Sequence, residues 1–119
     1  MEADPPFEVS PKLRELWEKK DFGRYADAKV GDVPVAFLAN LDITGGNSGS
    51  PVINGKGELI GLAFDGNWEA VVGDYLFQDA LNRSINVDAR YILFVLDKYS
   101  NAQNILNEMD IKDGQHSMK

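Results

Sequence analysis

The dipeptide Asn54-Gly55, which lies between two short apolar runs, is the feature that most restricts how this chain can fold. Asparagine followed by glycine is a strong hairpin signal, because both residues readily adopt the backbone angles of a tight turn. Residues 51–53 and 58–64 therefore predict an antiparallel β-hairpin. Residues 35–39 have the apolar, partly β-branched character of a buried strand, and residues 85–87 form one more candidate.

A helix is predicted ahead of these strands. Residues 1–9 predict an irregular lead-in, and Ser10 followed by Pro11 is typical of a helix start. Apolar side chains recur on one face from there to about Lys20, which predicts a helix that docks on another part of the protein.

Further helices are predicted near the end of the chain. Asp88 can cap a helix through Lys98, although the apolar run within it suits a buried strand almost as well. Ser100 with Gln103 predicts a capping box for a last helix near Glu108. The polar residues 110–119 predict a frayed tail.

Composition sets limits on the kind of protein and on its partners. A chain of 119 residues fits a single domain, and the 19 acidic against 12 basic residues argue against nucleic acid as a partner. The absence of cysteine excludes disulfides and thiolate metal sites. The longest apolar run, residues 91–96, is too short to cross a membrane, and the first residues do not resemble a signal peptide.

Residues 42–52 are the part of the chain whose residue types indicate a chemical function, because a run of glycines and small polar residues contributes little to the stability of a fold. Acyl transfer from a peptide bond needs an exposed hydroxyl beside backbone N–H groups that converge on one oxygen. Glycines let the backbone turn sharply enough for that. The N–H groups of Gly46 and Ser48 could form such an oxyanion hole beside the Ser48 hydroxyl. The other interpretation is a tight glycine turn whose serines bond only nearby backbone.

Three other motifs that use similar residues do not fit this loop. A hydrolase nucleophile elbow needs a helix directly after the serine, and Pro51 with the following turn forbids it. A phosphate-binding loop needs lysine after its last glycine, whereas the first lysine here is Lys56. A penicillin-binding site needs lysine three residues after its serine, where this chain has Pro51 or Ile53.

The string Gly45-Gly46-Asn47-Ser48-Gly49-Ser50-Pro51-Val52 resembles the nucleophile motif of the chymotrypsin clan of serine peptidases. Together with residues 13–17, 64–69, 87–91 and 107–109 it resembles peptidase family S46, which includes the bacterial dipeptidyl peptidases 7 and 11, and is closer to dipeptidyl peptidase 7. The resemblance implies a mainly β fold with flanking helices (α+β). The chain would be the nucleophile-bearing half of a chymotrypsin-like double β-barrel with a C-terminal helix, a single fragment, residues 1–119, of a longer enzyme.

The same resemblance implies roles for four residues. Ser48 would be the nucleophile, and the N–H of Gly46 would help to bind the oxyanion. Gly66 stands where acid-preferring relatives have an arginine, which implies an apolar or broad preference before the cut bond. Asp65 would lie where the substrate's free amine binds; the other interpretation is a strand-end aspartate that bonds local backbone. His116, the only histidine, lies in the polar tail and is not assigned as the base.

The family resemblance also gives expectations about the whole protein. It predicts release of dipeptides from peptides with a free N-terminus, in the periplasm or at the cell surface, without a cofactor or a metal. The catalytic histidine and aspartate would lie outside these residues, so the fragment alone is expected to be inactive. Two alternatives stay open: a non-catalytic binding module with the same barrel half, and a standalone domain that self-associates, as a homodimer, through apolar surface.

Overall fold

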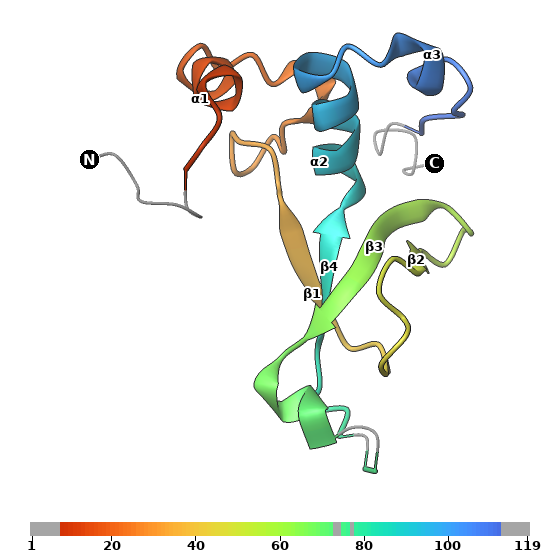
Figure 1. The fold of residues 1–119 in the computed structure, drawn as a ribbon. Helices are drawn as coiled ribbons and strands as arrows, with labels where there is room; N and C mark the ends of the chain where they lie inside the picture. The colour runs from red at the N-terminus through yellow and green to blue at the C-terminus, as the bar shows by residue number, and fades with distance from the viewer. Residues whose placement is uncertain (1–7, 73–74, 77, 113–119) are drawn as a thin grey trace.

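A computed structural model describes residues 8–72, 75–76 and 78–112. The helices gather at one end of the molecule, an antiparallel sheet forms its body, and a short helix lies at the opposite tip (Figure 1). The strands β1 (Ala36–Ala39), β2 (Pro51–Ile53), β3 (Leu59–Gly66) and β4 (Ser84–Asp88) pair in the order β1-β4-β3-β2. The sheet with its helices confirms the predicted mainly β, α+β class; the double β-barrel stays a prediction.

The helix α1 (Pro11–Glu18) begins where the sequence predicts. The Ser10 hydroxyl accepts a hydrogen bond from the N–H of Leu13 at 3.2 Å, which satisfies one of the N–H groups that a helix start leaves unpaired. The helix ends two residues before the predicted Lys20, which adopts a positive φ of 54° and turns the chain away.

The predicted hairpin is present, but its turn is longer than a two-residue Asn-Gly turn. The side-chain oxygen of Asn54 accepts from the N–H of Lys56 at 2.9 Å and from that of Glu58 at 3.0 Å. Gly57, not Gly55, takes the positive φ of 80°. The asparagine therefore organises the turn through its side chain, and the second glycine supplies the left-handed backbone.

Strand β4 leads directly into a helix, which settles the alternative left open for residues 88–98. The helix α2 (Ala89–Phe94) is followed by a π-helical turn, η3 (Val95–Tyr99). The Asp88 carboxylate caps α2 by accepting from the N–H of Arg90 at 2.8 Å, and it also holds the Arg90 guanidinium at 2.9 and 3.0 Å. These hydrogen bonds, with one to Asp27, raise the pKa of Arg90.

The predicted capping box at Ser100 is wrong. The last helix, α3 (Gln103–Leu106), has Ala102 as its N-cap, without a side-chain cap. The physical reason is a sharp turn after η3, where Asn101 has a φ of 51° and delays the helix start. The Gln103 amide donates to the Asp97 carboxylate at 2.7 Å, and the Ser100 N–H, which a capping box would bond to the Gln103 oxygen, donates to the Val95 carbonyl at 2.8 Å.

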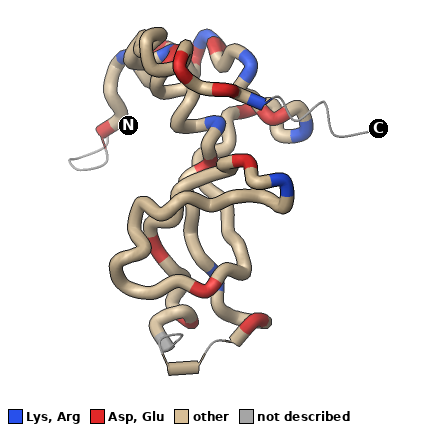
Figure 2. The backbone as a smooth tube through the Cα atoms, turned by 90° about the vertical axis from the view of Figure 1, so that its right-hand side faces the viewer, with Lys and Arg blue, Asp and Glu red and all other residues tan. Residues whose placement is uncertain are grey.

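The apolar core lies at the helical end, between α1, the 3-10 helix η1 (Gly23–Tyr25) and α2. Phe22, Tyr25 and Phe94 are buried there, and the rings of Phe22 and Phe94 meet edge to face at 6.4 Å. Most Lys and Arg residues also lie around this end, and few lie on the sheet (Figure 2). Within the described ranges, no helix has the length and apolarity needed to cross a membrane.

The inner side of β4 is polar. Ser84 and Asn86 alternate along the strand with no exposed surface at all. The Asn86 amide donates to the Ser84 hydroxyl at 3.1 Å and to the Phe37 carbonyl at 3.3 Å, while its oxygen accepts no hydrogen bond from the described residues. Small residues on the facing strands, such as Ala63, leave room for this polar pair.

Candidate active site

The glycine-rich loop between β1 and β2 is shaped by two glycines in the left-handed region. Gly46 has a φ of 98° and Gly49 a φ of 86°, angles that side chains rarely adopt. A Cβ atom added at either position would meet nothing within 4 Å. Glycine is therefore required there by the backbone angle and not by a lack of space.

Asn47 holds the tip of the loop in one conformation. Its side-chain oxygen accepts from the N–H of Thr44 at 2.8 Å, and its own N–H donates to the Thr44 carbonyl at 3.1 Å. The N–H of Ser50 in turn donates to the Asn47 carbonyl at 2.8 Å. The hydrogen bonds of Asn47 thus close the turn on both sides of Ser48.

Strand β3 fixes the position of this loop. The N–H of Gly49 donates to the Ala63 carbonyl at 2.6 Å, and the N–H of Ala63 donates to the Ser50 carbonyl at 2.9 Å. Ala63 is buried and pairs with Asn86 across the sheet. Ser48 therefore stands one residue before a point where the loop is bonded to the central strands.

Ser48 itself is exposed, and its hydroxyl makes no hydrogen bond to any described residue. The N–H groups of Gly46 and Ser48 also have no acceptor among the described residues, whereas that of Asn47 between them is bonded. Two free N–H groups and a free hydroxyl on one tight turn are the parts that acyl transfer needs for its oxyanion and its nucleophile.

A pocket of about 280 Å³ opens beside Ser48. Its walls come from the loop, the end of β3 and the 3-10 helix η2 (Trp68–Val72). The lining residues include Ser48, Asp65 and Gly66, so the structure brings three of the four predicted site residues together. Gly46 lies two residues away in the same loop, and His116 is outside the described residues.

A β-bulge shapes this pocket. The pairing of β3 with β4 shifts between Ala63 and Asp65, because Ala63 faces Asn86 while Asp65 faces Ile85. Side chains in a regular strand alternate between faces, but a bulge places extra residues on one side. Four consecutive residues, 63–66, accordingly line the pocket.

The electrostatics of the pocket are simple. Of the described residues that line it, only Asp65 is charged, and no Lys or Arg is among them. One Asp65 oxygen accepts from the N–H of Gly66 at 2.8 Å, and the other accepts nothing from the described residues. The pocket can therefore pair the Asp65 carboxylate with a positively charged group of a ligand, but its described lining has no cation to pair with an acidic group.

Sequence reasoning assigned no role to Asn67, which belongs to the pocket wall. Its amide bonds to both η2 and the segment before β4, and it lines the pocket directly after Gly66. The signal was present, because an asparagine that follows a glycine at a strand end is typical of a helix cap. Within the described ranges, no cluster of three or more His, Asp or Glu side chains is arranged to hold a metal.

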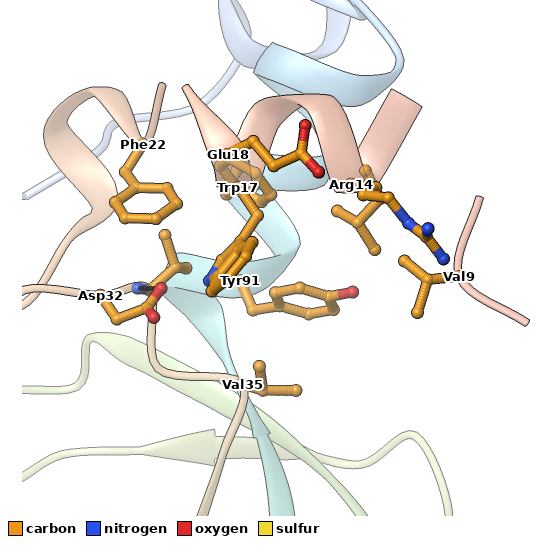
Figure 3. Close-up of a pocket in the computed structure, with 11 residues that line it drawn as sticks. Val9, Arg14, Trp17, Glu18, Phe22, Asp32, Val35 and Tyr91 are labelled. Atoms are coloured by element: carbon orange, nitrogen blue, oxygen red, sulfur yellow. Dashed lines mark hydrogen bonds between the residues drawn. The ribbon is translucent and has the colours of Figure 1, made fainter. Parts of the chain in front are cut away.

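A second hollow, larger and apolar, lies at the helical end. It has a volume of about 590 Å³ between α1, the segment before β1, and α2. The side chains of Trp17, Phe22, Val35 and Tyr91 surround it (Figure 3). Trp17 is 55% exposed, so the apolar face of the predicted docking helix is only partly covered by the described residues. This groove has apolar walls and none of the parts for chemistry found near Ser48.

These features are those of a serine hydrolase site carried by an antiparallel sheet, and comparison with known proteins identifies the family. The family model described as Peptidase S46 matches residues 1–111. The chain belongs to this peptidase family.

Relatives and solved structures agree with that assignment. The chain is 58% identical to dipeptidyl-peptidase 7 of Phocaeicola vulgatus over 92% of its length, and 55% identical to the Asp/Glu-specific dipeptidyl-peptidase of Porphyromonas gingivalis over 93%. It spans only 15% and 16% of those proteins. The crystal structure of Porphyromonas endodontalis DPP11 in complex with the dipeptide Arg-Asp superposes with a TM-score of 0.86 at 46% identity, covering 93% of this chain and 16% of that one.

Proposed function

We propose that this chain carries the nucleophile of a serine-type dipeptidyl peptidase, with Ser48 as the attacking residue. The observation that carries this proposal is the unbonded, exposed Ser48 hydroxyl beside the two free N–H groups of Gly46 and Ser48. Attack on a peptide carbonyl would place its oxygen against those N–H groups, which stabilise the negative charge of the tetrahedral intermediate.

The base that activates Ser48 would come from another part of the longer protein. The residues that the structure describes contain no histidine. A serine without a base keeps an unreactive hydroxyl, and the oxyanion hole alone gives a small residual rate. The fragment therefore holds the nucleophile and the oxyanion donors, and it is inactive on its own.

The pocket supports a substrate with a free N-terminus and an apolar or broadly chosen residue before the cut bond. The free oxygen of Asp65 would favour the substrate's ammonium group, and Gly66 leaves the pocket without a cation to pair with an acidic side chain. Sequence identity does not distinguish a dipeptidyl-peptidase 7 from an Asp/Glu-specific dipeptidyl-peptidase here, since relatives with these names are 58% and 55% identical to this chain.

The proposal extends to the location of the protein and to its contacts with other protein. The family resemblance supports a protein that acts in the periplasm or at the cell surface. The apolar groove at the helical end supports contact with more protein, either the remainder of the longer polypeptide or a second copy.

The test is dipeptide release from a peptide with a free N-terminus and an apolar second residue. Three proteins are compared: the full-length gene product, its Ser48→Ala variant and the fragment. Activity in the first alone supports the proposal. Full activity in Ser48→Ala would refute it, and silence of the full-length protein would favour the second candidate, a binding module, which the lack of a base among the described residues makes worth testing.

A further inference from the structure

Among the described residues that line the pocket, Asn67 makes the most side-chain hydrogen bonds. Its oxygen accepts from the N–H of Arg83 at 2.9 Å and from that of Ala70 at 3.2 Å. Its amide nitrogen donates to the Leu81 carbonyl and to the Glu69 carboxylate, both at 2.8 Å. A primary amide offers two donors and one oxygen, so this side chain is fully used.

These bonds join two segments that are far apart in sequence. Ala70 and Glu69 belong to η2, whereas Leu81 and Arg83 lie just before β4, up to 16 residues away. The backbone N–H of Asn67 adds a further bond to the Arg83 carbonyl at 2.9 Å. Asn67 therefore ties η2 to the segment that leads into β4.

The position of η2 decides the width of the pocket. Ala70 and Val71 form the wall that faces the end of β3. A Cβ atom added at Gly66 would stand only 3.0 Å from the Cβ of Ala70, so the wall already lies close to the strand. A small displacement of η2 would change which side chains fit.

We propose that Asn67 is a positioning residue for specificity: its amide fixes the η2 wall, and so sets the size of side chain that the pocket accepts. This inference rests on the proposed function. Among the described residues, Asn67 has no hydrogen bond to Ser48, and the loop of the nucleophile is held by its hydrogen bonds to Ala63. Loss of the clamp should therefore change KM and the discrimination between substrates more than it changes kcat.

The test uses the full-length protein and a pair of dipeptide substrates that differ only in the size of the residue before the cut bond. Asn67→Asp keeps both acceptor contacts but cannot donate to Leu81 or Glu69. We expect the ratio of kcat/KM between the two substrates to change by about tenfold, the scale of size discrimination in apolar pockets. A ratio is independent of the amount of folded enzyme, so reduced folding alone would leave it unchanged.

Three further variants separate positioning from general damage. Glu69→Gln keeps an oxygen that can accept from Asn67, and we expect the wild-type ratio. Asn67→Asp combined with Glu69→Gln restores their hydrogen bond with the donor reversed, and should recover part of the discrimination. Asn40→Ala removes another asparagine contact to the segment before β4, a 3.3 Å bond to Asp79 outside the pocket lining, and should change nothing.

The failure of this inference can be told from failure of the proposed function. A silent wild-type protein refutes the function, and with it the specificity role of Asn67. An active wild-type protein whose Asn67→Asp variant shows the same ratio refutes the clamp alone. Hydrogen exchange at the N–H of Arg83 gives an independent readout, because its acceptor among the described residues is the Asn67 side-chain oxygen: Asn67→Ala should accelerate this exchange, and unchanged exchange would also overturn the inference.

Discussion

The two hollows of this molecule differ in how their walls are made. The pocket at Ser48 is built from backbone: two left-handed glycines, free N–H groups and a bulged strand, with one charged side chain. The groove at the helical end is lined by aliphatic and aromatic side chains, among them Trp17 of α1 and Tyr91 and Phe94 of α2. Backbone geometry suits a site where charge develops, while apolar side chains suit contact with more protein.

This difference implies that the two regions should respond to mutation in different ways. Changes near Ser48 should alter rate or specificity with little loss of stability, because the loop is exposed and makes few packing contacts. Changes at the helical end should lower stability and leave the chemistry of each folded molecule intact. Each of the following experiments tests one side of that division.

Phe94→Ala should have the largest effect, on stability. The Phe94 ring is only 3% exposed and packs against Phe22 and Tyr91. Loss of a buried ring costs about 3–5 kcal/mol. Thermal unfolding of the full-length protein should show the loss, whereas Phe94→Leu should cost about 1.5 kcal/mol or less. A lowered kcat per folded molecule would contradict the expectation that changes at the helical end affect stability alone.

Gly46→Ala should lower kcat about 100-fold, the usual cost of a lost oxyanion-hole donor. Alanine disfavours the φ of 98°, so the N–H groups of Gly46 and Ser48 would no longer point the same way. Gly49→Ala is the matched control, because Gly49 has a similar φ of 86° and equally open space but is not an oxyanion donor. Equal losses in both variants would assign the effect to loop strain.

Gly66→Arg should shift specificity by about tenfold toward substrates with an acidic residue before the cut bond, since a charge-assisted pair is worth a few kcal/mol at best and the wall must move. The new Cβ atom meets that of Ala70 at 3.0 Å, so the gain is limited by crowding. Gly66→Gln adds similar bulk without charge and serves as the control. Competition between acidic and apolar peptides measures the ratio, and an unchanged ratio would remove Gly66 from the pocket's specificity.

Tyr25→Phe should have the smallest effect, about 1 kcal/mol of stability from the lost hydrogen bond to Asp97. Burial, followed by this bond, raises the pKa of the Tyr25 hydroxyl. The folded protein thus holds that proton more tightly than the unfolded chain. The resulting stability is complete below the unfolded value, near pH 10, and is lost as pH rises through the folded pKa.

The difference between wild type and Tyr25→Phe should therefore shrink above about pH 10. Tyr91→Phe is the control, because the Tyr91 hydroxyl has no hydrogen bond to the described residues. Unfolding curves at several alkaline pH values measure the trend. If the stability of wild type and of Tyr25→Phe fell in parallel with pH, the Tyr25 hydroxyl would not contribute to the loss of stability at alkaline pH.

Local chemistry allowed much of the fold to be predicted. Ser10 and Asp88 predicted the starts of their helices correctly, because a side-chain cap bonds only to backbone N–H groups a few residues away. The failed capping box at Ser100 has the opposite cause: a left-handed turn at Asn101, set by how η3 ends, moved the helix start. Propensity could not reveal that turn, since it depends on the packing of α2 and η3.

The candidate site was predictable only where one loop holds it. Ser48 and Gly46 were found because their spacing is local, whereas the contact of Asn67 with Leu81 and Arg83 spans a fold that the sequence does not display. The buried pair Ser84 and Asn86 likewise contradicts the usual rule that strands bury their apolar residues. Such polar pairs depend on partners across the sheet.

The bulge between Ala63 and Asp65 determines which side chains of β3 face the pocket, because it shifts the alternation of the strand by one residue. Removing one residue from this stretch would restore strict alternation and send part of 63–66 to the far side of the sheet. The composition of the strand would hardly change, yet the pocket would present different chemistry. A single insertion or deletion at this point would therefore change several residues of the pocket wall at once, whereas a substitution changes one.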